Sequence, residues 1–150
     1  MIHTKKWGDR YLSICNEVAS WSRDPSTQVG AVVVGDKGQI LSQGYNGFPR
    51  NIRDNANRYN DKKRKYELIV HAEMNAIYNA TLNGQSLQGS TMYISGLGVC
   101  HECAKAIIQV GITQVVAQCK EIKPGWEDSC NLTKKLFEEA GIDYLLEEKK

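Results

Sequence analysis

The sequence has no apolar run approaching the length of a membrane span, and its first ten residues, MIHTKKWGDR, lack the apolar segment typical of a signal peptide. Cysteine occurs an odd number of times, five, which does not suit a disulfide framework, and 150 residues suffice to bury a core without one. Internal repeats, low-complexity tracts and linkers are also lacking. We therefore expect a single domain over residues 1–150, with reduced thiols, a cytoplasmic location and no membrane partner.

The net charge is too small to identify a partner, because nineteen basic and seventeen acidic side chains leave only +2. Its distribution is uneven: residues 50–65 hold seven basic and two acidic side chains, a net +5, which leaves −3 elsewhere. Such a run is most often a solvated face, and otherwise it binds an anion such as a phosphate group or a polynucleotide backbone. Only Tyr59 and Tyr66 accompany it, so a base-stacking platform for nucleic acid is poorly supported.

Hydrophobic periodicity and turn residues predict four helices and five strands. The predicted helices cover residues 10–23, 71–82, 101–110 and 128–140, and the predicted strands form a hairpin over 28–45 and cover 90–95, 112–118 and 142–146. Residues 50–65 are expected to be irregular or weakly helical. The order α-β-β-α-β-α-β-α-β, with short connections, predicts an α/β fold with a mixed sheet and helices on both of its faces.

Two cysteines three positions apart, Cys100 and Cys103, lie where a strand-like run gives way to a helix-like run. They could be a redox pair, metal ligands or two buried thiols. A helix N-terminus lowers the pKa of a thiol, which favours a redox pair and metal-bound thiolates equally. A third ligand would decide between these alternatives. The other three cysteines are dispersed in helical or strand positions and are expected in the core: Cys15, Cys119 and Cys130.

His71 is the candidate for that third ligand, because it begins the other core helix directly after the apolar run ELIV. His3 lies near the N-terminus, and His101 would project away from the cysteines on either side of it. Three protein ligands with an open fourth position are what a catalytic zinc site requires, whereas a structural site has four. The sequence therefore favours a catalytic metal site over a structural one.

Glu73 follows His71 by two residues and has two explanations. A carboxylate in the first turn of a helix is favoured by the helix dipole, and this explanation suffices for Glu73 taken alone. Beside a zinc ion, a carboxylate that is not itself a ligand can instead take a proton from the zinc-activated water and pass it to a leaving group. We expect the second role, which makes Glu73 the candidate catalytic residue.

The segments HAEMNAI and VCHECAKAII match the zinc deaminase signature H-x-E…P-C-x-x-C in order and spacing. Three further blocks, SRDPSTQVGAVVV (22–34), GYNGFP (44–49) and EEAGI (138–142), are similar to the nucleotide branch of that superfamily. On these motifs the chain resembles the zinc-dependent deoxycytidylate (dCMP) deaminases of the cytidine deaminase superfamily. One position departs from the signature, since Val99 stands where proline usually precedes the first cysteine. The turn there must be made differently, for example by a β-bulge.

The resemblance implies a three-layer α/β/α fold with a central mixed five-stranded sheet. It also implies hydrolysis of dCMP to dUMP and ammonia, a step in pyrimidine deoxynucleotide biosynthesis. One zinc ion per chain would be bound by His71, Cys100 and Cys103 and would activate water for attack on C4 of the cytosine ring. Glu73 would carry the proton first to N3 and then to the departing ammonia.

The resemblance also suggests residues that bind the substrate. Asn46 in GYNG matches an asparagine that contacts the nucleotide sugar, although Asn-Gly is by itself a common turn dipeptide. The Ala72 N–H, at a helix N-terminus, is the candidate donor to the base carbonyl. Arg23 and the basic residues of 50–65 are candidates for the 5′-phosphate. Tyr66 and Trp126 could line the pocket, although packing against the sheet is the commoner role for an aromatic residue.

Relatives of this kind are often hexamers controlled by dCTP and dTTP, so a homo-oligomer with these effectors is expected by resemblance. The alternative function is a polynucleotide deaminase acting on tRNA adenosine or single-stranded DNA cytosine, with residues 50–65 as its backbone contact. A silent, nucleotide-binding regulator is disfavoured because Glu73 is present. We expect a small nucleotide, and no nucleic acid, as the partner.

Overall fold

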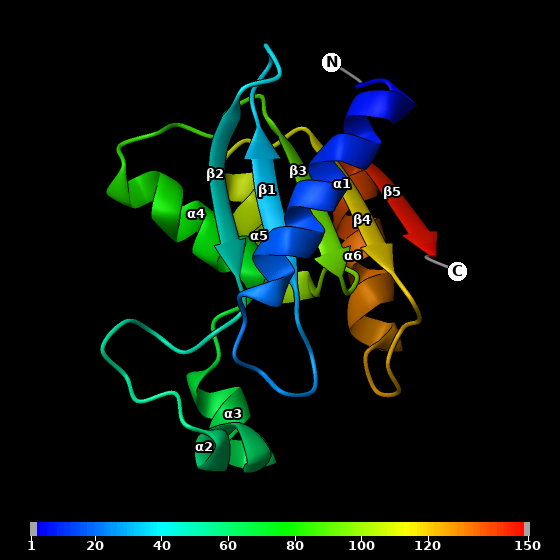
Figure 1. The fold of residues 1–150 in the computed structure, drawn as a ribbon. Coiled ribbons are helices and arrows are strands. Elements are labelled where there is room, and N and C mark those ends of the chain that lie inside the picture. The colour runs from blue at the N-terminus through cyan, green and yellow to red at the C-terminus, as the bar shows by residue number, and fades with distance from the viewer. Residues whose placement is uncertain (1–2, 149–150) are drawn as a thin grey trace.

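The computed structural model describes residues 3–148, which form a five-stranded sheet with helices on both sides (Figure 1). The helices are α1 (Lys5–Ser20), α2 (Ala56–Asn60), α3 (Lys62–Leu68), α4 (Ala72–Leu82), α5 (His101–Gln109) and α6 (Glu127–Ala140). The strands are β1 (Gly30–Val34), β2 (Ile40–Tyr45), β3 (Thr91–Gly96), β4 (Gln114–Cys119) and β5 (Asp143–Glu148). Within this part of the chain, no helix combines the length and the apolar character needed to cross a membrane.

The strand order in the sheet is β2-β1-β3-β4-β5. Strand β1 pairs antiparallel with both β2 and β3, whereas β3–β4 and β4–β5 are parallel pairs. The predicted mixed five-stranded sheet is therefore confirmed. Because β3 and β4 are parallel, their carboxyl ends lie at the same edge of the sheet, and the connections to α5 and α6 begin there.

The side chains of the central strands alternate between two apolar layers. On one face, Val32, Val34 and Tyr93 pack with Tyr11 and Cys15 of α1. On the other face, the strands meet α4, α5 and α6 in a larger core that includes Ala31, Val33, Met92, Ile94, Ala76, Ile107 and Phe137. Figure 1 shows α1 on the near side of the sheet and α5 and α6 behind it. The predicted three-layer α/β/α architecture is confirmed.

Helix α4 lies unusually close to β2, and a glycine makes that approach possible. A Cβ atom on Gly44 would lie 2.3 Å from the Ala76 nitrogen and 2.7 Å from the Ala72 oxygen, distances that no side chain tolerates. Asn75 adds a polar contact, because its Nδ2 donates to the Tyr45 carbonyl at 2.8 Å. The N-terminus of α4, where His71 lies, is thus seated firmly against the sheet.

The structure refines two predicted regions. The first helix begins at Lys5, because Thr4 caps it by accepting a hydrogen bond from the Trp7 N–H, and it ends at Ser20 rather than residue 23. The basic stretch was expected to be irregular or weakly helical, and it forms two short helices, α2 and α3, so the helical alternative holds. Asn55 and Asp61 cap these helices, each accepting a backbone N–H three residues later.

Helices α2 and α3 project from the edge of the domain near the end of β2 (Figure 1). Their segment is joined to the rest by an isolated bridge between Gly47 and Val70 and by stacking of Phe48 on Tyr59, with ring centroids 4.2 Å apart. This segment leads directly into His71, so it lies beside the N-terminus of α4.

Candidate active site

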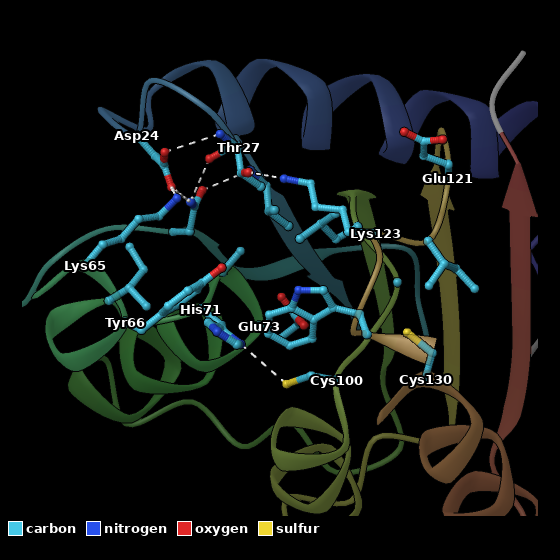
Figure 2. Close-up of a pocket in the computed structure, with 18 residues that line it drawn as sticks. Asp24, Thr27, Lys65, Tyr66, His71, Glu73, Cys100, Glu121, Lys123 and Cys130 are labelled. Atoms are coloured by element: carbon cyan, nitrogen blue, oxygen red, sulfur yellow. Dashed lines mark hydrogen bonds and ion pairs between the residues drawn. The ribbon is translucent and has the colours of Figure 1, made fainter. Parts of the chain in front are cut away.

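A cavity lies at the carboxyl ends of β3 and β4, between the N-termini of α4 and α5 and the projecting helix α3 (Figure 2). The residues of the motifs lie deep in it: His71, Ala72, Glu73 and Cys100 all contribute to its lining. Trp126 and Tyr66 add aromatic surface, and the ring centroids of Trp126 and His71 are 6.4 Å apart. Both aromatic residues proposed from the sequence thus line the cavity.

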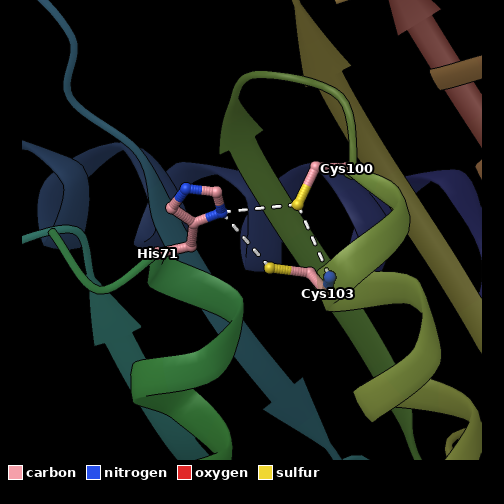
Figure 3. A group of neighbouring side chains, drawn as sticks. All are labelled: His71, Cys100 and Cys103. Atoms are coloured by element: carbon pink, nitrogen blue, oxygen red, sulfur yellow. Dashed lines mark hydrogen bonds between the residues drawn. The ribbon is translucent and has the colours of Figure 1, made fainter. Parts of the chain in front are cut away.

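The N-termini of α4 and α5 bring the three candidate ligands together (Figure 3). His71 is the residue before α4 and Cys100 the residue before α5, and both have extended backbone. Cys100 Sγ also caps its helix by accepting the Cys103 N–H at 3.4 Å. Cys103, in the first turn of α5, then lies on the same side of the helix as Cys100.

The distances between the donor atoms fit a tetrahedral metal ion. His71 Nδ1 lies 3.4 Å from Cys100 Sγ and 3.4 Å from Cys103 Sγ, and the three atoms lie within 4.8 Å of one another. Zinc–sulfur bonds of about 2.3 Å and zinc–nitrogen bonds of about 2.0–2.1 Å imply a nitrogen–sulfur separation of about 3.6 Å in a tetrahedron. The residues are therefore positioned to bind a metal ion, and contact of both sulfurs with one imidazole favours that use over a redox pair.

The electrostatics of the two thiols differ, as expected when they share one proton. The hydrogen bond from Cys103, helped by His71, lowers the pKa of Cys100 to about 4 despite burial. The Cys100 thiolate and burial together raise the pKa of Cys103. Cys100 in turn raises the pKa of His71, against the effect of burial. The site holds negative charge on sulfur, which a divalent cation would neutralise.

Glu73 is almost completely buried, with 4% of its surface exposed, and it lines the cavity next to His71. Burial raises the pKa of its carboxyl group, and the neighbouring Cys100 thiolate acts in the same direction, whereas His71 opposes them. A carboxyl group with a raised pKa can both accept and donate a proton near neutral pH. Glu73 is thus a buried carboxyl group with a raised pKa at the floor of the cavity, beside the three candidate ligands.

Asn46 is buried, and its side-chain amide holds the loop that forms the upper wall. Its Oδ1 accepts the Val29 N–H at 2.9 Å, and its Nδ2 donates to the Thr27 carbonyl at 2.9 Å and to Asp24 Oδ2 at 3.5 Å. Asn46, Thr27 and Asp24 also line the cavity. The residue is therefore more than a turn former, because it organises the cavity wall to which it belongs.

Of the two candidates for binding the 5′-phosphate, Arg23 and the basic stretch 50–65, only the basic stretch contributes to the cavity lining within residues 3–148. The residues that line the cavity, within 3–148, do not include Arg23, whose side chain is 71% exposed and pairs with Asp54 at 3.3 Å. Of the seven basic residues in 50–65, Lys65 alone belongs to that lining. Its Nζ lies 2.7 Å from Asp24 Oδ2 and donates to Ser26 Oγ at 3.0 Å.

Lys123 is a second cation at the cavity that the sequence analysis did not single out. It lies in the connection between β4 and α6, and its amino group donates to Thr27 Oγ1. In Figure 2 the amino groups of Lys65 and Lys123 approach the Asp24–Thr27 loop from opposite sides. A signal was available, because Lys123 follows the strand parallel to and beside β3, and ligand sites form at such carboxyl ends. Cys130, expected in the core, is buried but also borders the cavity.

The turn from β3 to Cys100 contains no β-bulge, contrary to the expectation raised by Val99. The pairing of β3 with β1 and with β4 keeps one register through Ser95 and Gly96. Gly96 redirects the chain instead, with φ of +127°, and a Cβ atom there would lie 2.5 Å from the Gln28 carbonyl oxygen. The positive φ at Gly96 therefore helps to shape this turn, which lacks the proline of the signature.

Comparison with known proteins agrees with this geometry. A family model, the cytidine and deoxycytidylate deaminase zinc-binding region, matches residues 5–119. A probable deoxycytidylate deaminase of Drosophila melanogaster is 39% identical, over 92% of this chain and 70% of that protein. Human deoxycytidylate deaminase is 33% identical, over 93% of this chain and 78% of that protein. The solved dCMP deaminase of the cyanophage S-TIM5, in complex with dCMP and dUMP, has a similar fold, with a TM-score of 0.75 at 20% identity, covering 97% of this chain and 99% of that one.

Proposed function

The chain belongs to the cytidine and deoxycytidylate deaminase family, and on that basis we propose that it hydrolyses dCMP to dUMP and ammonia with one zinc ion per chain. The observation that carries the proposal is the position of Glu73, buried at the floor of the cavity beside a His-Cys-Cys metal group. Its relatives in fly and human bear the same activity in their names. The product would serve the synthesis of pyrimidine deoxynucleotides in the cytoplasm.

The three ligands and Glu73 divide the chemistry between them. A zinc ion held by His71 Nδ1 and the two Sγ atoms would lower the pKa of water and supply a nucleophile at neutral pH. Glu73 receives the proton that the water loses and delivers it to N3 of the ring as oxygen bonds to C4. It then moves the proton of the hydroxyl group now on C4 to the amino nitrogen, the bond from C4 to that nitrogen breaks as the C4 carbonyl forms, and ammonia leaves.

The cavity suits a pyrimidine base above these groups. Trp126 and Tyr66 supply aromatic walls, and Ala72 begins helix α4, where backbone N–H groups point outward. The Ala72 N–H would donate to the base carbonyl. Asn46 would lie beside the sugar, as part of the cavity wall that its hydrogen bonds to Thr27 and Val29 hold in place. These contacts would hold the ring with C4 toward the metal group.

Lys123 and Lys65 would bind the 5′-phosphate. Both line the upper part of the cavity, and both lie next to hydroxyl groups of the Ser26–Thr27 loop. Lys65 is neutralised by Asp24, whereas the amino group of Lys123 has a hydroxyl group, that of Thr27, as its partner. Charge-assisted donors at this position favour a nucleoside monophosphate over a nucleoside as the substrate.

The polynucleotide alternative is less well supported by the basic stretch. Arg50 is engaged with Asn79 at 2.7 Å, Arg64 with Glu67 at 3.8 Å, and Lys65 with Asp24. Its two tyrosines do not form a stacking platform, since Tyr59 is buried against Phe48. A continuous, unengaged basic surface beside the site would favour a polymer more strongly.

A substrate panel tests the proposal: ammonia release is measured with dCMP, CMP, deoxycytidine, dCTP, single-stranded DNA and tRNA. We expect dCMP to exceed deoxycytidine in kcat/KM by roughly 10⁴-fold, because a site arranged to bind a charged group of the substrate rejects the analogue that lacks it. Lys123→Met should lower kcat/KM for dCMP by roughly 10–100-fold and leave that for deoxycytidine unchanged, as loss of one charge-assisted hydrogen bond predicts. Turnover of a polymer without turnover of dCMP would reject the assignment.

The proposal extends to assembly and regulation: by resemblance, the chain would form a homo-oligomer, a hexamer, with dCTP and dTTP as effectors. Trp21 and Tyr45 support an assembly surface beside the GYNG loop, since they are 48% and 40% exposed and their rings lie edge to face at 6.1 Å. Light scattering after size-exclusion chromatography, with and without dCTP, measures the assembly. A monomer under all conditions would remove this extension and leave the catalytic proposal intact.

A further inference from the structure

The turn before the first thiolate ligand is held by two hydroxyl groups from the C-terminal part of the chain. The backbone N–H of Val99 donates to Tyr144 Oη at 3.3 Å, and the Val99 carbonyl accepts the Thr133 hydroxyl at 2.9 Å. Val99 is fully buried, so both backbone groups would lack solvent partners without these side chains. The next residue is Cys100, whose Sγ lies 3.4 Å from His71 Nδ1.

Both hydroxyl groups are themselves fixed by their surroundings. Thr133 lies on α6 and is fully buried. Tyr144 lies on β5, with its ring edge to face with Phe137 at 5.1 Å, and its hydroxyl is 3.7 Å from the position a Cβ would take on Gly98. Tyr144 therefore ties the Val99 backbone to strand β5, and Thr133 ties it to helix α6.

Valine, rather than proline, makes this arrangement possible. Proline has no N–H, so it could not donate the hydrogen bond that the Tyr144 hydroxyl oxygen accepts from Val99. A proline also stiffens a turn through its own ring, whereas here the turn contains Gly96 and Gly98 and needs external support. With the Val99 backbone held at both its N–H and its carbonyl, the direction of the next Cα–Cβ bond, that of Cys100, is set.

We propose that Tyr144 and Thr133 are positioning residues for the metal site: by binding the Val99 backbone, they aim Cys100 Sγ at the position where His71 Nδ1 and Cys103 Sγ converge. The proposal rests on the proposed function only in requiring that the three ligands bind a metal ion. Groups that orient metal ligands typically account for about 10–100-fold in metal affinity. Neither residue belongs to the lining of the cavity, so they act through Cys100.

The test measures zinc affinity by competition between the zinc-loaded protein and a chromophoric chelator. Tyr144→Phe and Thr133→Val, which remove only a hydroxyl group, should each weaken zinc binding by about 10-fold or more. Thr133→Ser, which restores the hydroxyl, should bind zinc like the wild type. The cobalt-substituted variants should show altered sulfur-to-metal and d–d absorption bands, a signature of changed ligand geometry.

Tyr11→Phe is the matched control, because it likewise removes a tyrosine hydroxyl that binds the backbone, in this case by donating to the Gly38 carbonyl at 2.8 Å, far from the site. It should lower thermal stability without changing zinc affinity or the cobalt spectrum. Zinc affinity within twofold of wild type in Tyr144→Phe and Thr133→Val would overturn the inference. If Tyr144→Phe does not fold, the comparison of Thr133→Val with Thr133→Ser decides. A wild-type protein that binds no zinc would instead reject the proposed function.

Discussion

Lys65 and Asp24 form an ion pair of 2.7 Å at the wall of the cavity, with side chains that are only 13% and 1% exposed. The two residues lie 41 positions apart in the sequence, in the loop before β1 and in helix α3. The pair links helix α3 to the loop before β1, and a more exposed pair, Arg23 with Asp54, links the same loop to the chain just before α2. Asp24 also accepts the backbone N–H groups of Ser26 and Thr27, so the pair fixes the loop that Asn46 supports.

Lys65→Met should therefore weaken both folding and substrate binding. It leaves a buried carboxylate without its partner, which costs about 3 kcal/mol in the free energy of unfolding measured with urea. It should also raise KM for dCMP. The double variant Lys65→Met with Asp24→Asn should recover much of the stability, because no unpaired charge remains, but should keep the raised KM.

Lys62→Met is the control for that prediction, since Lys62 lies on the same helix and is exposed. It should leave the unfolding free energy within about 0.5 kcal/mol of wild type. An equal rise in KM for both lysine variants would point to a diffuse electrostatic effect rather than to the Lys65 contact.

The pair also predicts how stability depends on pH. Burial opposes ionisation of Asp24, but the hydrogen bond from Lys65 and the Ser26 N–H outweigh it, so the pKa of Asp24 is lowered in the folded protein. Its contribution is then present above the unfolded value of about 3.9 and is lost as pH falls through the lower folded-state value. The difference in unfolding free energy between wild type and Asp24→Asn should shrink as pH decreases below about 4. A difference that stays constant with pH would mean that the carboxylate charge is not its source.

Cys103→Ala should remove most of the bound metal. Two ligands remain after the substitution, and the ion would no longer tie the N-termini of α4 and α5 together, so thermal stability should fall as well. Atomic emission spectroscopy of the purified variant measures its zinc content. Cys130→Ala is a matched control, because Cys130 borders the same cavity but lies outside the ligand group, and it should retain one zinc per chain.

Glu73→Gln should keep its zinc and lose turnover. A positioned acid–base group contributes roughly 10²–10⁴-fold to a rate, and one carboxyl group here serves successive proton transfers. The loss should appear in kcat, with KM for dCMP little changed. Glu121→Gln provides the comparison, since Glu121 also lines the cavity but is exposed, and it should stay within a few-fold of wild type. A near-normal kcat in Glu73→Gln would assign the proton transfers to another residue.

The fold could be predicted well because its signals are local. The alternation of apolar residues in 28–45 indicates the hairpin. The glycines at 111 and 141 mark the ends of two helices, and both adopt positive φ, +84° and +74°. The start of α1 was missed, and for residues 50–65 the choice between irregular and weakly helical structure stayed open, because these features depend on caps at Thr4, Asn55 and Asp61 that hydrophobic periodicity does not reveal.

The sequence by itself predicted which three side chains come together as candidate metal ligands and that Glu73 lies beside them, because each ligand lies at a helix N-terminus and the spacing along one helix fixes which side chains share a face. Only the tertiary structure decided which cations reach the cavity. Arg23 lies outside its lining, Lys65 was one of seven candidates, and Lys123 comes from a connection nearly a hundred residues beyond Thr27. The same holds for Tyr144 and Thr133 at the Val99 backbone. Contacts between distant segments depend on strand order and helix packing, and no local pattern of residues carries that information.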